Sequence, residues 1–194
     1  MVKTIALSCT GEGFGHAART VALAEELRKT CRLVVFCPPH LFPFMRQHLD
    51  SVPLEEIPYF SFVKFRDRID YARTVYTNLP ALFRFPVSVR RIVGQLRQYR
   101  ISALISDYDP FGSSAAKALG VPVLQINHPA VVLRQYDFSL QSFLAKTVSV
   151  ILMGWYQRKL LVSFYNGDVG PVVRRSIVAG KRPAEDFFVV YVKP

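Results

Sequence analysis

A glycine-rich loop between a predicted strand and a predicted helix is the feature that most constrains the fold. The stretch Leu7–Arg19, LSCTGEGFGHAAR, starts as an apolar run and finishes in a helical pattern. Between the two parts stand Gly11, Gly13 and Gly15, and His16 follows directly. Glycines let a backbone approach a ligand closely, and the next helix offers free N–H groups at its positive end. In doubly wound α/β folds this loop lies at the carboxyl edge of the sheet, where ligands bind.

Strand and helix patterns alternate along the rest of the chain. Short apolar runs bounded by glycine or proline predict strands at residues 4–9, 32–37, 52–58, 103–106, 121–127 and 160–166. Helical periodicity and stop signals predict helices at residues 15–29, 40–49, 112–120 and 141–161. This order predicts the α/β class, with a Rossmann-like doubly wound parallel sheet that carries helices on both faces.

The loop departs from the two common nucleotide-binding motifs. A dinucleotide site needs G-x-G-x-x-G and an acid at the end of the second strand. Here His16 takes the place of the third glycine, and the second strand ends Phe36-Cys37-Pro38 without a carboxylate. A P-loop needs a lysine after its glycines, and none follows these. An NAD-dependent oxidoreductase and a P-loop NTPase are therefore disfavoured.

The histidine at the end of the loop is the residue that offers chemistry. A helix N-terminus disfavours the imidazolium, so the ring of His16 should stay neutral. A neutral imidazole can accept a proton from a hydroxyl nucleophile. The alternative is a structural role, in which His16 caps the helix or packs under the loop.

Three segments resemble one protein family. Gly11–Leu27, GEGFGHAARTVALAEEL, resembles the first loop and helix of two-domain GT-B glycosyltransferases, above all family 28 and its uncharacterised bacterial and archaeal relatives. Leu104–His128 is similar to a second block of those relatives, and Asp186–Val192, DFFVVYV, resembles the strand that opens their second domain. The resemblance implies that 1–180 form the N-terminal acceptor-binding Rossmann-like domain. It also implies that 181–194 are a linker and the first strand of a C-terminal donor-binding domain absent from this chain.

The resemblance also implies a reaction and a pair of catalytic residues. Such enzymes transfer a sugar from a nucleotide-diphosphate sugar to an acceptor hydroxyl; we expect a hexosyltransferase-type, inverting enzyme that uses no metal and no cofactor. A histidine after the first strand is commonly their base, and His16 has this position. Some relatives orient that histidine with a later aspartate, for which Asp107 is our candidate. Because most of the donor site would lie in the other domain, this fragment alone is expected to be inactive.

Further residues are predicted to contact substrate because they lie in the loop, in the first turn of its helix or at later strand ends. They are Gly11, Glu12, Gly13, Phe14, Gly15, Arg19, Asp109 and His128. The planar fork of Arg19 suits a phosphate, although a solvated helix arginine is an equal alternative. Glu12 can equally be an exposed loop carboxylate and His128 a structural histidine. Asp109 precedes a proline, so a turn or a helix cap is its stronger alternative.

Residues 59–100 break the strand–helix rhythm. They carry nine basic and two acidic side chains, with nine aromatic residues interleaved, in a chain whose net charge is +11. One interpretation is an anionic membrane surface, which suits a lipid or lipid-linked acceptor. An equal alternative is a helical region that packs its aromatic rings while its arginines are solvated. Nucleic acid is disfavoured, because no RNP, KH or helix-turn-helix motif accompanies the segment.

Composition and apolar runs predict where the protein works. The longest apolar run, Val148–Tyr156, is far shorter than the about 20 residues that span a bilayer, and the N-terminus lacks a signal-peptide pattern. Cys9, Cys31 and Cys37 form no CxxC pair and are predicted to be buried free thiols. We therefore expect a cytoplasmic protein that associates peripherally with the inner face of the cell membrane.

The expected partners are a nucleotide sugar and a carbohydrate or lipid acceptor. The alternative function is a non-catalytic Rossmann-like module that binds an anionic or nucleotide ligand. The run 143–161 can join the predicted membrane surface, but a core helix is the favoured interpretation there.

Overall fold

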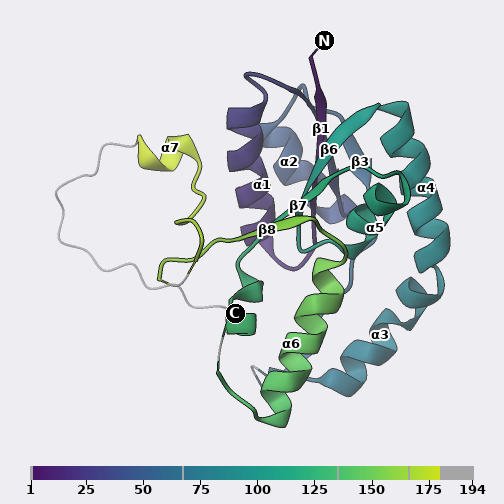
Figure 1. The fold of residues 1–194 in the computed structure, drawn as a ribbon, viewed down its shortest axis with the longest axis vertical. Helices are drawn as coiled ribbons and strands as arrows, with labels where there is room; N and C mark the ends of the chain where they lie inside the picture. Colours follow the sequence, from purple (N-terminus) through teal and green to yellow (C-terminus); the bar gives the residue numbers. More distant parts are fainter. Residues whose placement is uncertain (1, 67, 135, 166, 180–194) are drawn as a thin grey trace.

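Six parallel strands form one sheet at the centre of the molecule. A computed structural model describes residues 2–66, 68–134, 136–165 and 167–179, and Figure 1 shows the arrangement. The strands lie in the order β3-β2-β1-β6-β7-β8, which runs outward in both directions from the central pair β1 and β6. Their bounds are β1 Thr4–Cys9, β2 Arg32–Cys37, β3 Leu54–Glu56, β6 Ile101–Asp107, β7 Val123–Asn127 and β8 Arg158–Leu161. The predicted doubly wound sheet is thus confirmed.

Helices cover both faces of the sheet because the strands bury both sets of alternating side chains. On one face, Leu7 of β1 packs in a core with helices α1 (Phe14–Leu27) and α2 (Phe42–His48). On the other face, Ala6 packs in a core with α4 (Phe85–Gln98), α5 (Pro110–Ala118) and α6 (Leu140–Met153). Since successive strand residues point to opposite faces, this two-sided burial explains the nearly continuous apolar runs.

The two central strands end at the same level. Cys9, the last residue of β1, pairs with Asp107, the last residue of β6. One residue further, the backbone N–H of Thr10 donates to the carbonyl of Asp107 at 3.1 Å. The loops that follow β1 and β6 therefore start side by side at the carboxyl edge of the sheet. This is the point where the strand order reverses, and α/β proteins bind ligands at such points.

A long excursion separates β3 from β6. It contains a small hairpin, β4 (Lys64–Phe65) with β5 (Arg68–Ile69), followed by α3 (Tyr71–Phe83) and α4. Asn78 is the buried residue of α3; its side chain donates to the carbonyl of Ser61 at 2.7 Å and accepts from the N–H of Ser61 at 2.9 Å. The rest of α3 is largely open to solvent. The remaining short helices are η1 (Pro39–Leu41), η2 (Pro129–Arg134) and α7 (Arg175–Val178).

The prediction that a helix extends from 141 to 161 was wrong at its C-terminal end. Helix α6 stops at Met153, because Gly154 follows with a φ of 62° and the chain turns into β8. The strand predicted at 160–166 therefore lies earlier, at Arg158–Leu161. The favoured core helix was also only half right, since α6 buries one side and exposes Phe143 and Ile151 on the other.

Two smaller predictions need comment. Cys9 and Cys37 are buried free thiols as predicted, but Cys31 is only partly buried because it lies in the turn between α1 and β2. The predicted linker and strand at 181–194 lie outside the described residues, so that prediction stays open.

Candidate active site

The loop after β1 delivers His16 to the first turn of α1. Gly13 precedes the helix with a φ of 81°, a left-handed conformation that glycine adopts without strain. Gly13, Phe14 and Gly15 are exposed, whereas His16 is buried. No side chain caps the start of α1, so its first N–H groups are left for another acceptor.

The structure brings His16 and Asp107 together. Nδ1 of His16 lies 2.9 Å from Oδ1 of Asp107, and the two side chains are 10% and 5% exposed. The two atoms are close enough for an ion pair, but their geometry does not meet the criteria for an N–H···O hydrogen bond. Catalytic hydrogen bonds often align only when substrate binds. Because an ionised carboxylate only accepts, a neutral His16 would carry its proton on Nδ1 and leave Nε2 as the acceptor.

Arg19 joins the same carboxylate from the next turn of α1. Its Nε lies 3.2 Å from Oδ2 of Asp107, and its side chain is 12% exposed. Within the described residues, Nη1 of Arg19 is buried and has no hydrogen-bond partner. His16 and Arg19 are three positions apart and therefore share one helix face. The predicted phosphate contact of Arg19 is untested, and the contact that the structure shows is with Asp107.

Tyr108 is a site residue that the sequence analysis missed. It follows Asp107 with a φ of 62°, and its ring stacks on that of His16 with centroids 6.1 Å apart. Its hydroxyl lies 3.1 Å from Oγ of Ser149, and burial raises the pKa of the phenol. The Tyr108 N–H donates to Oε1 of buried Gln125 at 3.3 Å. Strained backbone of this kind gathers at functional sites.

Asp109 has the capping role that its position before a proline allowed. Its two carboxylate oxygens accept from the N–H groups of Phe111 and Gly112, each at 2.9 Å, at the start of α5. The residue is only 1% exposed, and burial raises the pKa of the carboxyl to about 6. Both oxygens of Asp109 are thus engaged at the start of α5, and almost none of its surface is exposed.

The remaining loop residues contact the chain itself. Glu12 accepts a hydrogen bond from the N–H of Phe62 at 2.7 Å, which ties the loop to the excursion. Gly11 lies so close to His40 and Tyr59 that a Cβ there would come within 2.7 and 2.8 Å of their rings. Phe14 is 59% exposed. The loop is therefore shaped by packing on one side and open on the other.

His128 directly follows β7. It is exposed, and its Nδ1 donates to the carbonyl of Val162 at 2.8 Å. Together with Gly15 and Arg19 it lines a pocket of about 220 Å³. The structure thus places His128 near the predicted site, although no contact joins it to His16 or Asp107 among the described interactions.

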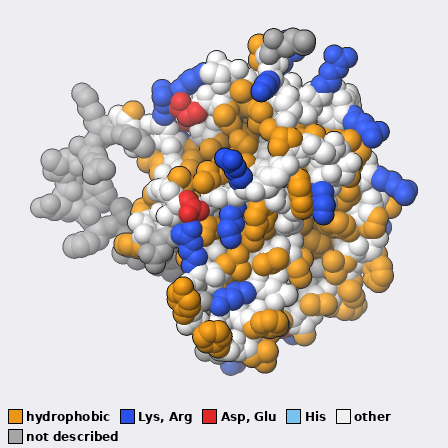
Figure 2. All heavy atoms as spheres, in the orientation of Figure 1, with side chains coloured by type: hydrophobic (Ala, Val, Ile, Leu, Met, Phe, Trp, Pro, Cys, Tyr) orange, Lys and Arg blue, Asp and Glu red, His pale blue; other side chains and the backbone are white. Residues whose placement is uncertain are grey.

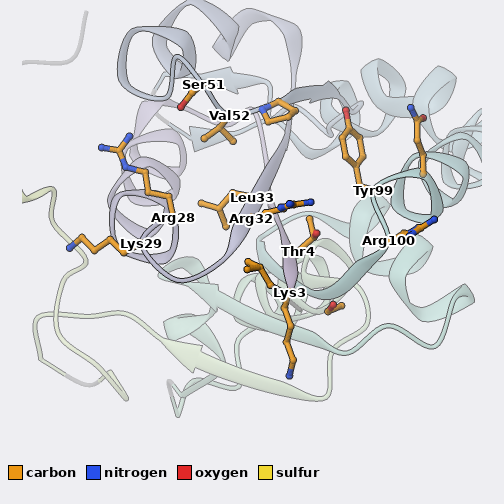
Figure 3. A pocket seen from close by; sticks show the side chains of 14 residues that line it. Lys3, Thr4, Arg28, Lys29, Arg32, Leu33, Ser51, Val52, Tyr99 and Arg100 are labelled. Carbon is orange, nitrogen blue, oxygen red and sulfur yellow. The ribbon is translucent and has the colours of Figure 1, made fainter.

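A larger hollow lies elsewhere among the described residues. It measures about 1300 Å³ and opens at the amino edge of the sheet, among Lys3, Arg28, Arg32 and Arg100 (Figure 3). These side chains are exposed. Residues with catalytic geometry lie at the opposite edge. Across the described ranges, no three His, Cys, Asp or Glu side chains gather into a group that could hold a metal ion.

Comparison with known proteins shows which family the chain matches. Residues 3–194 match the family model described as Glycosyl transferase family 1. No curated protein sequence matches the chain significantly.

Several solved structures are similar in fold. SsfS6, a glycosyltransferase from Streptomyces sp. SF2575, is 12% identical with a TM-score of 0.52; the match covers 78% of this chain and 44% of that one. MurG from Acinetobacter baumannii is 17% identical with a TM-score of 0.48, over 75% of this chain and 39% of that one. UDP-GlcNAc 2-epimerase from Methanocaldococcus jannaschii is 9% identical with a TM-score of 0.49, over 82% of this chain and 39% of that one. The chain therefore spans less than half the length of each of these proteins.

The GT-B resemblance of the sequence is confirmed, although the matching model bears the name of family 1 rather than family 28. The SsfS6 likeness concerns the fold, and the family match covers almost the whole chain. The chain belongs to glycosyl transferase family 1 and has the fold of the N-terminal domain of a GT-B glycosyltransferase.

Proposed function

We propose that this chain is the acceptor-binding part of an enzyme that transfers a sugar from a nucleoside diphosphate sugar to an acceptor hydroxyl. The observation that carries the proposal is the distance of 2.9 Å between His16 Nδ1 and Asp107 Oδ1 at the carboxyl edge of the sheet. A buried histidine next to a buried carboxylate is the arrangement of a general base with an orienting partner.

In the proposed reaction His16 accepts one proton. Nε2 of His16 takes the proton of the acceptor hydroxyl while the acceptor oxygen forms a bond to the anomeric carbon. The bond between that carbon and the diphosphate oxygen breaks, and the nucleoside diphosphate leaves with the electron pair. Asp107 stabilises the imidazolium that forms. Because there is a single displacement with one base, the product has inverted configuration.

The start of α1 suits the anionic part of a substrate. Its first N–H groups have no side-chain cap, and Gly13 and Gly15 leave the backbone exposed there. Helix N-termini bind phosphates through such groups. In this proposal the loop contacts the diphosphate, while a separate donor-binding domain holds the nucleoside.

The test is sugar transfer by the full-length protein with a panel of nucleotide sugars. The variant His16→Gln should lower kcat by about 100-fold or more, the usual contribution of a general base. His48→Gln is the matched control, because the ring of His48 contacts Phe44 and Arg174 instead of Asp107. If folded His16→Gln protein transferred sugar at the rate of the wild type, His16 would not be the base.

We also propose that the acceptor is reached at a membrane surface. Helices α3 and α6 lie at the same end of the molecule in Figure 1, and hydrophobic side chains gather at that end in Figure 2. Exposed aromatic residues of these two helices and of the turn before α6 include Tyr76 at 77%, Phe83 at 81%, Phe138 at 96% and Phe143 at 64%. No helix in the described ranges has the length and apolar character needed to cross a bilayer. Exposed aromatic residues with nearby arginines suit the interface of an anionic bilayer, here the cytoplasmic face of the cell membrane.

Vesicle sedimentation tests the membrane part separately. The double variant Phe83→Ser, Phe143→Ser should bind phosphatidylglycerol vesicles at least about tenfold more weakly than the wild type, since burial of such side chains drives interfacial binding. Ile177→Ser is the control, because Ile177 is 60% exposed on α7, outside this surface. Unchanged binding by the double variant would show that α3 and α6 do not form the contact.

A further inference from the structure

We infer that Arg19 is a positioning residue of the proposed site. It holds the Asp107 carboxylate so that one oxygen faces Nδ1 of His16, and it does so without touching the reacting atoms. The kinetic consequence rests on the proposed function, but the geometric consequence can be measured without any turnover.

The carboxylate of Asp107 is divided between two residues of α1. Oδ1 lies 2.9 Å from Nδ1 of His16, and Oδ2 lies 3.2 Å from Nε of Arg19. The backbone of Asp107 is already fixed by its pairing with Cys9 and by the Thr10 N–H. The remaining freedom is rotation about the side-chain bonds, and the planar guanidinium of Arg19 restrains that rotation.

Arg19 also balances the buried charge. The Asp107 side chain is 5% exposed, and a buried carboxylate is costly unless cations or N–H donors surround it. A neutral His16 supplies a single N–H and no charge, whereas the guanidinium of Arg19 is always positive. Arg19 therefore allows a neutral His16 to lie beside an ionised Asp107. A base needs that state before the reaction starts.

A direct contact of Arg19 with substrate phosphate is the competing role. Arg19 lines the 220 Å³ pocket with Gly15 and His128, so part of its side chain reaches open space. However, Nε already faces Asp107, and Nη1 is buried. The two roles predict different kinetics, because a phosphate contact would act mainly on KM for the donor and a positioning contact on kcat.

The first experiment measures the tautomer of His16 by NMR in full-length protein labelled with 15N at histidine. The wild type should show one tautomer, with the proton on Nδ1, whereas Arg19→Met and Asp107→Asn should each show a mixture. Arg28→Met is the matched control, an exposed arginine at the other end of the same helix, and should match the wild type. The variant His16→Gln assigns the signal.

The outcomes separate this inference from the proposed function. If Asp107→Asn leaves the His16 tautomer unchanged, the His16–Asp107 pair itself is wrong. If Asp107→Asn changes the tautomer and folded Arg19→Met does not, Arg19 has no positioning role. Should Arg19→Met fail to fold, Arg19→Lys decides, since lysine keeps the charge but lacks the fork; a tautomer identical to the wild type then overturns the inference.

Kinetics supply the second measurement. Arg19→Met should lower kcat by about ten- to a hundredfold, as misplaced catalytic groups do, while KM for the donor stays within about twofold. Arg19→Lys should restore part of the lost kcat. A rise in KM with kcat unchanged would instead assign Arg19 to phosphate binding.

Discussion

Replacing Asp109 with asparagine should remove a pH-dependent loss of stability between pH 4 and pH 7. The carboxylate is buried at 1% exposure and accepts from the N–H groups of Phe111 and Gly112. Burial nevertheless raises its pKa from 3.8 to about 6, so removal from water outweighs the hydrogen bonds that favour the charged form. Asparagine keeps an oxygen for one of the two N–H groups, loses the acceptor for the other and has no charge to bury, so the two proteins differ most in how their stability changes with pH.

The sign of the effect follows from proton binding. The folded state has the higher pKa, so between about pH 4 and pH 6 it binds more protons than the unfolded state. The stability of the wild type therefore falls as pH rises through this window and is level above it. A pKa difference of about two units corresponds to about 3 kcal/mol. The variant lacks this loss, so its unfolding free energy should gain on the wild type by about 3 kcal/mol between pH 4 and pH 7.

Urea unfolding followed by circular dichroism at several pH values measures the difference. Asp137→Asn is the control, because the N–H of Ser139 lowers the pKa of this exposed carboxyl, and its pH dependence should have the opposite sign. A stability difference between Asp109→Asn and the wild type that does not change from pH 4 to pH 7 would refute the reasoning.

Two further predictions concern packing and thiol reactivity. Asn78→Ala removes the side chain that pairs both backbone groups of Ser61, so it should lower the unfolding free energy by about 2 kcal/mol in urea titrations; a change below about 0.5 kcal/mol would mean that α3 is held by other contacts. In native protein at pH 8, Ellman's reagent should react first with partly buried Cys31, because burial raises the pKa of Cys9 and raises that of Cys37 to about 12. Cys31→Ser should abolish the fast phase, and a fast phase that survived would contradict the burial of the other two thiols.

Local signals were strong where strands are buried on both faces. The apolar runs at Thr4–Cys9 and Arg32–Cys37 end at glycine or proline, so their bounds could be predicted to the residue. The excursion from 57 to 100 mixes apolar and basic side chains without one clear period. Its hairpin and the division into α3 and α4 depend on tertiary contacts such as that between Asn78 and Ser61, which no short-range pattern records.

The candidate site could be predicted in part. His16 follows from the loop alone, because it replaces a glycine that a dinucleotide site would need. Asp107 came from the family resemblance, and the matching ends of β1 and β6 explain why it meets His16. The left-handed conformation of Tyr108 and the direction of the Arg19 side chain result from packing across about ninety residues of sequence. Spacing along the chain contains no information on either.

The excursion between β3 and β6 has a consequence for the evolution of such enzymes. Its inner side is constrained, since Phe60 and Leu96 belong to the core, and it contacts the glycine loop where Phe62 donates to Glu12. Its outer side contributes nothing to the ladder that aligns the ends of β1 and β6. If the proposed function holds, mutation can remodel the outer helices, and with them the choice of acceptor, without disturbing His16. Among homologues we expect this segment to diverge fastest while the two central strands change least.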